Sequence, residues 1–133
     1  MSRREIREQV FKILFRIEFN KKEEMDEQLK WFFQDDEQPV SEKNQEEIKA
    51  KYEKIVEKLE TIDSMLDEKA DKWSVKRMGK VELTLLRLAV YEMEFDEDIP
   101  TSVAINEAVE LAKKFGQDES PAFINGVLAK FTK

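Results

Sequence analysis

The chain of 133 residues contains no cysteine and no histidine. These absences exclude disulfide bonds, thiolate metal sites, a cysteine nucleophile, imidazole bases and histidine-ligated metals. Only three glycines and three prolines occur, which argues against a turn-rich β fold and long linkers. No apolar run approaches the roughly 20 residues that span a bilayer, and charges interrupt the apolar stretch after the basic N-terminus, unlike in a signal peptide. We therefore expect one soluble, cytoplasmic domain.

Charge is distributed unevenly along the chain. The formal net charge is -7, with +4 in residues 1–22, -9 in residues 23–72 and -2 in residues 73–133. Because an acidic molecule as a whole repels nucleic acid, a basic N-terminal segment on an acidic body indicates a local contact with a polyanion. The alternative is a helix N-terminus that carries arginines without binding anything.

Hydrophobic residues recur at steps of three and four along nearly the whole chain, which is typical of amphipathic helices. From Ile6 to Phe19 an aliphatic face lies beside a second row formed by Phe11, Phe15 and Phe19. This wide apolar arc predicts a helix that is central in the core.

The next two helices are separated by polar residues. The second helix ends before Gln38-Pro39, and Ser41 is expected to cap the third. A shift in the phase of the apolar residues places a helix break near residues 60–63. We expect Trp31 and Trp73 to pack in the core, although Trp31 lies off its apolar stripe; anchoring a protein interface is the alternative.

The C-terminal half contains three more helices. Residues 81–95 are apolar on most sides, which predicts a helix buried almost all round. Gly116 is expected as a left-handed C-cap, and Ser120 is expected as an N-cap with Pro121 at the first helical position. The whole pattern gives seven helices, no strand and short connections, and so predicts a compact all-α domain.

Acidic residues are numerous enough to raise the question of a carboxylate site. Such sites need carboxylates directed into an apolar pocket, and the acidic residues here fall mostly on predicted polar faces. Glu107 and Glu110 are three residues apart on one helix, but Lys113 follows Glu110 at the same spacing. Glycine-rich phosphate-binding motifs are absent. We expect no catalytic site, no metal and no cofactor.

Four blocks of the sequence resemble the NusB family. They are WSVKRMGKVELTLLRLAVYE at 73–92, DIPTSVAINEAVELAKKFG at 98–116 and SPAFINGVL at 120–128, together with RREIREQVFKILF at 3–15, which is similar to the family's arginine-rich first helix but carries fewer arginines. The blocks occur in order and with fitting spacing, whereas residues 23–70 match only in helical pattern.

The resemblance implies a fold, a function and a set of partners. NusB-like proteins have seven helices in two subbundles, so residues 3–132 would form a single RNA-binding domain. They act in bacterial transcription antitermination: they pair with the ribosomal protein NusE and bind boxA RNA in ribosomal-RNA leaders, within a complex of RNA polymerase, NusA and NusG. The resemblance implies no catalytic activity and no cofactor, and it leaves open whether a homodimer forms.

The resemblance also assigns site residues. Those that match the family's RNA contacts are Arg3, Arg4, Arg7, Lys113, Glu119 and Phe123. Arginine suits this role because its planar guanidinium binds phosphate and stacks on unpaired bases. We expect the three arginine side chains to extend past the core edge, and Phe123 either to offer a stacking face or to pack in the core. Glu5 interrupts the arginines, which favours weak RNA binding without a partner.

The surface that contacts NusE is expected mainly on the segment at 73–95, which includes the helix at 81–95, and on its neighbours. Glu82 and Arg87 are the polar positions of that helix and are expected to contact NusE. The alternatives for both are a solvated edge or an internal salt bridge.

Two other functions fit a helical chain of this kind. One is the NusB-like RNA-binding module of a ribosomal-RNA cytosine methyltransferase, which would need a following catalytic domain with a nucleophilic cysteine. The other is a purely structural helical interaction protein, which salt-dependent RNA binding would exclude.

Overall fold

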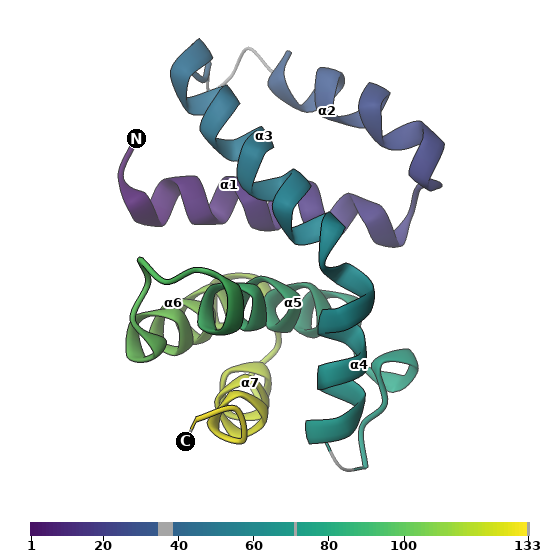
Figure 1. Ribbon diagram of the computed structural model, residues 1–133, viewed down its shortest axis with the longest axis vertical. Coiled ribbons are helices and arrows are strands. Elements are labelled where there is room, and N and C mark those ends of the chain that lie inside the picture. Colours follow the sequence, from purple (N-terminus) through teal and green to yellow (C-terminus); the bar gives the residue numbers. More distant parts are fainter. Residues whose placement is uncertain (35–38, 71, 133) are drawn as a thin grey trace. The chain divides into compact units, whose positions relative to one another are not determined.

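The computed structural model describes residues 1–34, 39–70 and 72–132. These residues form seven α-helices and three short 3-10 helices, with no strand among them (Figure 1). The predicted all-α class with seven helices is confirmed. The chain divides into two compact units, Met1–Val56 and Glu57–Lys133.

The first unit is built from three α-helices. Its elements are α1 (Arg3–Phe15), η1 (Arg16–Glu18), η2 (Lys22–Glu24), α2 (Met25–Phe33) and α3 (Glu42–Glu57, with its last residue beyond the unit boundary). Each α-helix buries one apolar stripe, as its spacing predicts. The buried hydrophobic residues are Ile6, Val10, Phe11, Ile13, Leu14, Met25, Leu29, Ile48, Tyr52 and Ile55.

Helix α1 starts and ends on local signals. The Ser2 hydroxyl accepts a hydrogen bond from the N–H of Glu5 at 3.1 Å, and the Glu5 carboxylate accepts one from the N–H of Ser2 at 2.9 Å. The helix ends at Phe15 rather than Phe19, and the chain tightens there into η1. The predicted aromatic row is nevertheless confirmed, because the ring of Phe15 lies 6.1 Å from that of Phe11 and 5.1 Å from that of Phe19.

The start of α3 agrees with the cap that the sequence predicts at Ser41. The N–H of Asn44 donates to the Ser41 hydroxyl at 3.3 Å, so the predicted cap is confirmed. Helix α2 already ends at Phe33, and Gln38, which marked its predicted limit, lies outside the described residues.

The second unit contains the remaining four α-helices. Its elements are α4 (Leu59–Lys69), η3 (Val75–Arg77), α5 (Lys80–Phe95), α6 (Thr101–Phe115) and α7 (Ser120–Ala129). Helix α5 contacts α4, α6 and α7, and α6 also contacts α7 (Figure 1). The residues of α5 from Leu83 to Glu92 are all buried, with Leu85 and Leu86 at 0% exposure. The prediction of a helix buried almost all round is therefore confirmed.

Three predicted boundaries need correction. The break between the third and fourth helices lies at Lys58, before the predicted residues 60–63. The predicted break is late because Leu59 continues the apolar stripe of the third helix, so the change of phase shows in the sequence only after it. Gly116 ends α6 in an extended conformation (φ -95°, ψ -166°), not a left-handed one. Ser120 is the first residue of α7 rather than its N-cap, which is Glu119.

Gly116 is required for space rather than for a special dihedral angle. A Cβ at this position would lie 2.6 Å from the Cβ of Ser120 and 2.8 Å from the carbonyl oxygen of Ala112. The α6–α7 connection is thus closed by backbone and side-chain atoms that leave no room for a methyl group.

Both tryptophans are exposed, so the prediction that they pack in the core is wrong. Trp31 on α2 keeps 52% of its surface exposed, and Trp73 after α4 keeps 45%. Among the described residues, no helix is both long enough and apolar enough to cross a membrane.

Candidate RNA-binding and partner-binding residues

The first two arginines of α1 reach solvent. Arg3 and Arg4 are both exposed. The Arg3 guanidinium donates to the Glu47 carboxylate of α3 at 2.8 Å, but the Arg3 side chain remains 89% exposed. An ion pair this exposed contributes little to stability, so its guanidinium can exchange the carboxylate for another anion at small cost.

Glu5 lies between these arginines and is fixed by the start of the helix. The hydrogen bond from the backbone N–H of Ser2, with the Ser2 hydroxyl as a second contribution, lowers the pKa of Glu5 below its ordinary value. The carboxylate is therefore ionised at neutral pH and reduces the positive charge of the N-terminal turn.

Arg7 does not extend past the core edge as expected. It is 7% exposed, so the expectation of a solvent-facing guanidinium is wrong. The reason is its helical phase, since Arg7 follows Ile6 and precedes Val10 by three residues and so lies at the margin of the buried stripe. An RNA phosphate would reach it less readily than Arg3 and Arg4.

The remaining predicted RNA contacts lie in the second unit. Lys113 on α6 is exposed and pairs with Glu110 at 3.1 Å, as their i,i+3 spacing allows. Glu119 is exposed at the N-terminus of α7. Both side chains are therefore accessible to a partner molecule.

Phe123 on α7 packs against another aromatic ring. It is half-buried, and its ring meets that of Trp73 edge to face, with 5.7 Å between the ring centroids. Trp73 was expected in the core and Phe123 either there or at a stacking face, but the structure pairs them where Trp73 is open to solvent.

Glu82 is tied to the start of α7. Its carboxylate accepts a hydrogen bond from the Ser120 hydroxyl at 3.0 Å, while that hydroxyl also accepts from the N–H of Gln117 at 2.9 Å. Glu82 is half-buried, so part of it still reaches the surface of α5. The contact joins α5 to the α6–α7 connection.

Arg87 is occupied inside the second unit. Its Nε donates to one carboxylate oxygen of Asp63 on α4 and its Nη2 to the other, each at 2.8 Å. The side chain is 10% exposed, against 26% for Asp63. Of the alternatives for Arg87, the internal salt bridge is confirmed.

A further basic segment escaped the sequence analysis. Residues 72–80 carry four cationic side chains and no acidic one. The net charges of residues 23–72 and 73–133 do not reveal this segment, because the boundary between the two regions falls inside it. The net charge summed over nine consecutive residues would have revealed it.

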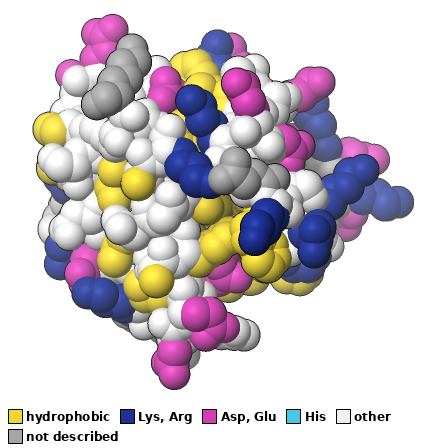
Figure 2. All heavy atoms as spheres, turned by 90° about the horizontal axis from the view of Figure 1, so that it is seen from below, with side chains coloured by type: hydrophobic (Ala, Val, Ile, Leu, Met, Phe, Trp, Pro, Cys, Tyr) yellow, Lys and Arg dark blue, Asp and Glu magenta, His cyan; other side chains and the backbone are white. Residues whose placement is uncertain are grey.

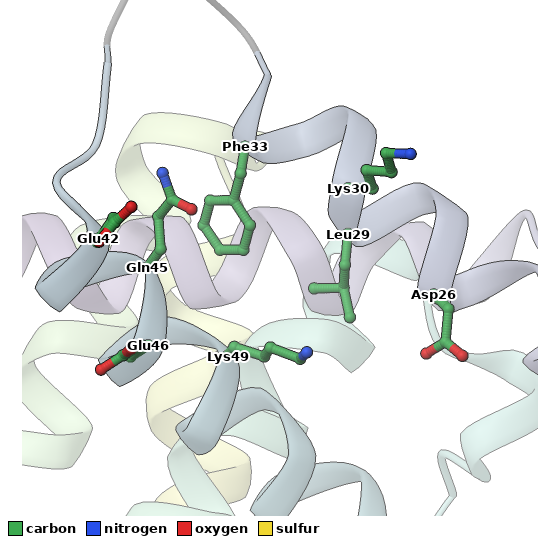
Figure 3. A pocket seen from close by; sticks show the side chains of 8 residues that line it. All are labelled: Asp26, Leu29, Lys30, Phe33, Glu42, Gln45, Glu46 and Lys49. Carbon is green, nitrogen blue, oxygen red and sulfur yellow. The ribbon is translucent and has the colours of Figure 1, made fainter.

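The first unit also holds an open pocket of about 620 Å³ between α2 and α3. Figure 3 shows Leu29 and Phe33 pointing from α2 toward α3, where Gln45 faces them. Charged side chains of both signs surround these apolar groups. No group of three or more acidic side chains that could hold a metal ion occurs in the described part of the chain.

Comparison with known proteins supports the resemblance. A sequence model of the NusB family matches residues 4–133. The transcription antitermination protein NusB of Agathobacter rectalis is 53% identical over 131 residues, which cover 98% of this chain and 99% of the relative. The NusB of Clostridium novyi is 44% identical over 138 residues and is covered to 99%.

Solved structures agree with the sequence relatives. T. maritima NusB has a TM-score of 0.85 at 38% identity, covering 98% of this chain and 89% of that one. A crystal structure of the antitermination factors NusB and NusE in complex with dsRNA has a TM-score of 0.76 at 27% identity, covering 96% and 92%. The chain therefore belongs to the NusB family and is a non-enzymatic transcription antitermination protein.

Proposed function

We propose that this protein pairs with the ribosomal protein NusE and binds boxA RNA in ribosomal-RNA leaders. In this role it acts in the cytoplasm within an RNA polymerase complex that includes NusA and NusG. The RNA contacts we propose are the exposed Arg3 and Arg4 in the first unit, with the exposed Lys113 and Glu119 and the half-buried Phe123 in the second; Arg7 is a buried, secondary contact.

One observation carries this proposal. The structurally similar NusB is crystallised together with NusE and dsRNA, and the likeness extends over 96% of this chain. The two chains are also 27% identical in sequence, so they share more than the fold. The family membership and the exposed N-terminal arginines support the same partners.

Electrostatics predicts weak RNA binding by the isolated protein. A net charge of -7 opposes the approach of a polyanion, and only two N-terminal arginines are exposed. NusE would add further RNA contacts, and binding of one segment then raises the effective concentration of the next. Linkage requires that RNA tightens the protein pair by the same factor, typically about 5- to 150-fold.

A thermodynamic box at fixed salt tests the proposal. RNA affinity is measured with and without NusE, and NusE affinity with and without boxA RNA. We expect both couplings to be positive and equal. Equal RNA affinities with and without NusE would refute the partner's contribution to the RNA site.

The arginine contacts are tested with a charge-matched control. Arg3→Ala with Arg4→Ala should weaken RNA binding and flatten its salt slope by up to about 0.7 per lost single-strand phosphate contact. Lys43→Ala with Lys54→Ala removes the same charge from exposed positions of α3 and should change neither. Equal effects of the two double variants would assign the binding to net charge alone.

The NusE side is tested at Glu82. Glu82→Lys reverses the charge on α5 and should weaken the protein pair, whereas Glu82→Gln keeps an acceptor for the Ser120 hydroxyl and should preserve the fold. RNA binding by the isolated protein should stay nearly unchanged in both variants. An unchanged NusE affinity for Glu82→Lys would remove Glu82 from the interface.

A further inference from the structure

An aromatic and cationic surface lies where α4 leads into α5. We name it the Trp73 patch, and it consists of Trp73, Arg77 and Phe123. The Arg77 Cζ lies 5.6 Å from the centroid of the Trp73 ring, and the Phe123 ring meets Trp73 edge to face at 5.7 Å. Trp73 thus contacts two other groups with planar π systems in the second unit.

The patch remains open despite these contacts. Trp73 retains 45% of its surface exposed, which is unusual for the largest apolar side chain. Burial against Arg77 and Phe123 therefore leaves much of the indole available to a flat ligand. The end of α4 and helix α7 lie at the bottom of Figure 1, and Figure 2 views the protein from below. In that view, Lys and Arg side chains lie next to exposed hydrophobic ones.

Hydrogen bonds hold the segment in place. The N–H of Val75 donates to the Asp67 carboxylate at 2.7 Å, and the N–H of Trp73 donates to the Ala70 carbonyl at 3.0 Å. The Arg77 guanidinium donates to the Lys72 carbonyl at 3.3 Å. A ligand would therefore meet a largely preformed surface and lose little by ordering it.

Local charge indicates what this surface binds. Residues 72–80 carry four cationic side chains and no acidic one, on a chain with a net charge of -7. Exposed aromatic rings beside cationic groups are typical of surfaces on which unpaired bases stack while phosphates contact Lys and Arg. A purely apolar protein partner would not require this concentration of one charge sign.

We propose that the Trp73 patch stacks one unpaired base of a single-stranded RNA, with the cations of residues 72–80 contacting the flanking phosphates. Trp73 supplies the stacking surface, Arg77 holds the indole from one side and Phe123 supports it from α7. This inference rests on the proposed RNA-binding function and adds Trp73 and Arg77 to its contacts.

The first test measures affinity for a fluorescently labelled single-stranded boxA RNA, in the presence of NusE. Trp73→Leu should lower the affinity by about 5- to 150-fold, the range for loss of one base–aromatic stack, and Trp73→Phe should retain most of it. Trp31→Leu removes the other exposed tryptophan, on α2, and should leave the affinity unchanged. Thermal melting of each variant confirms that the fold is intact.

The second test observes stacking directly. The chain contains two tryptophans, so a Trp31→Phe background leaves Trp73 as the single indole fluorophore. Stacking on a base should quench its fluorescence on RNA addition, with the same midpoint as the affinity measurement. Arg77→Gln should weaken binding more than Arg77→Lys, which keeps the charge.

The outcomes separate this inference from the function on which it rests. If Trp73→Leu binds RNA as well as Trp31→Leu does, while the Arg3 and Arg4 double variant loses affinity, the Trp73 patch is not an RNA contact and the proposed function stands. If Trp73→Leu weakens only NusE binding, the patch is a protein interface and the inference is overturned. If the wild-type protein binds no RNA with or without NusE, both fail.

Discussion

The pair formed by Arg87 and Asp63 offers the sharpest test of the packing described for the second unit. Replacing Arg87 by Met removes the guanidinium but keeps an unbranched apolar side chain that can fill part of its space. The change breaks two charge-assisted hydrogen bonds of 2.8 Å between α5 and α4. It also leaves the Asp63 carboxylate without its cation.

The expected loss follows from the burial of the two groups. Breaking a fully buried ion pair costs about 3–5 kcal/mol, because one charge is left without compensation. The Asp63 side chain keeps 26% exposure, so water can partly solvate the remaining carboxylate. We therefore expect Arg87→Met to lower the free energy of unfolding by about 2–4 kcal/mol.

A second substitution should restore much of this stability. In Arg87→Met with Asp63→Leu, both charged groups are replaced by apolar ones, so no carboxylate remains unpaired. We expect the double variant to lie within about 1 kcal/mol of the wild type. The single variants and the double variant together form a double-mutant cycle with a large coupling energy.

Urea unfolding followed by circular dichroism measures these free energies, and NusE binding is measured on the same proteins in native buffer. An internal brace should change stability while leaving the affinity of the folded protein for NusE nearly unchanged. A loss below about 0.5 kcal/mol for Arg87→Met, or additive effects in the double variant, would refute the reasoning. Lost NusE affinity with unaltered stability would instead make Arg87 a partner contact.

Three other predictions test single features. Leu86→Ala should cost about 2–5 kcal/mol by urea unfolding, since the side chain is fully buried; a loss under 1 kcal/mol would contradict its central place in α5. By calorimetry, Gly116→Ala should destabilise by about 1–3 kcal/mol through its close contacts, whereas Gly126→Ala, with nothing within 4 Å, should stabilise by about 0.5–1 kcal/mol; equal signs would refute the steric argument. Ser2→Ala should raise the lowered pKa of Glu5 toward its ordinary value of 4.5, as followed by NMR titration; an unchanged pKa would exclude the Ser2 hydroxyl as a cause.

The Glu5 prediction carries a sign for stability. A carboxyl whose pKa is lower in the folded state stabilises the protein above its unfolded pKa, and this contribution disappears as the pH falls through the folded value. The N-terminal turn of α1 should therefore loosen in acid before the buried helices respond.

Features that depend on neighbours in sequence could be predicted without coordinates. The apolar run at 81–95 predicts the buried α5, and Ser41 predicts the start of α3, because periodicity and capping act within a few residues. The family blocks and the exposed Arg3 and Arg4 belong to the same category, since they follow from residue order and from position at a helix start.

Contacts between distant residues required the tertiary structure. Arg87 could be a solvated edge or a buried ion pair until Asp63, 24 residues earlier, was placed beside it. Trp73 was expected in the core because its type favours burial, yet whether a ring is covered depends on what the rest of the chain brings against it. The sequence alone determined which residues form helices and which family they resemble, because hydrogen bonding along a helix is local. Only the tertiary structure decided which polar groups are paired and which aromatic rings remain open, because burial is a property of packed neighbours that lie far apart in the chain.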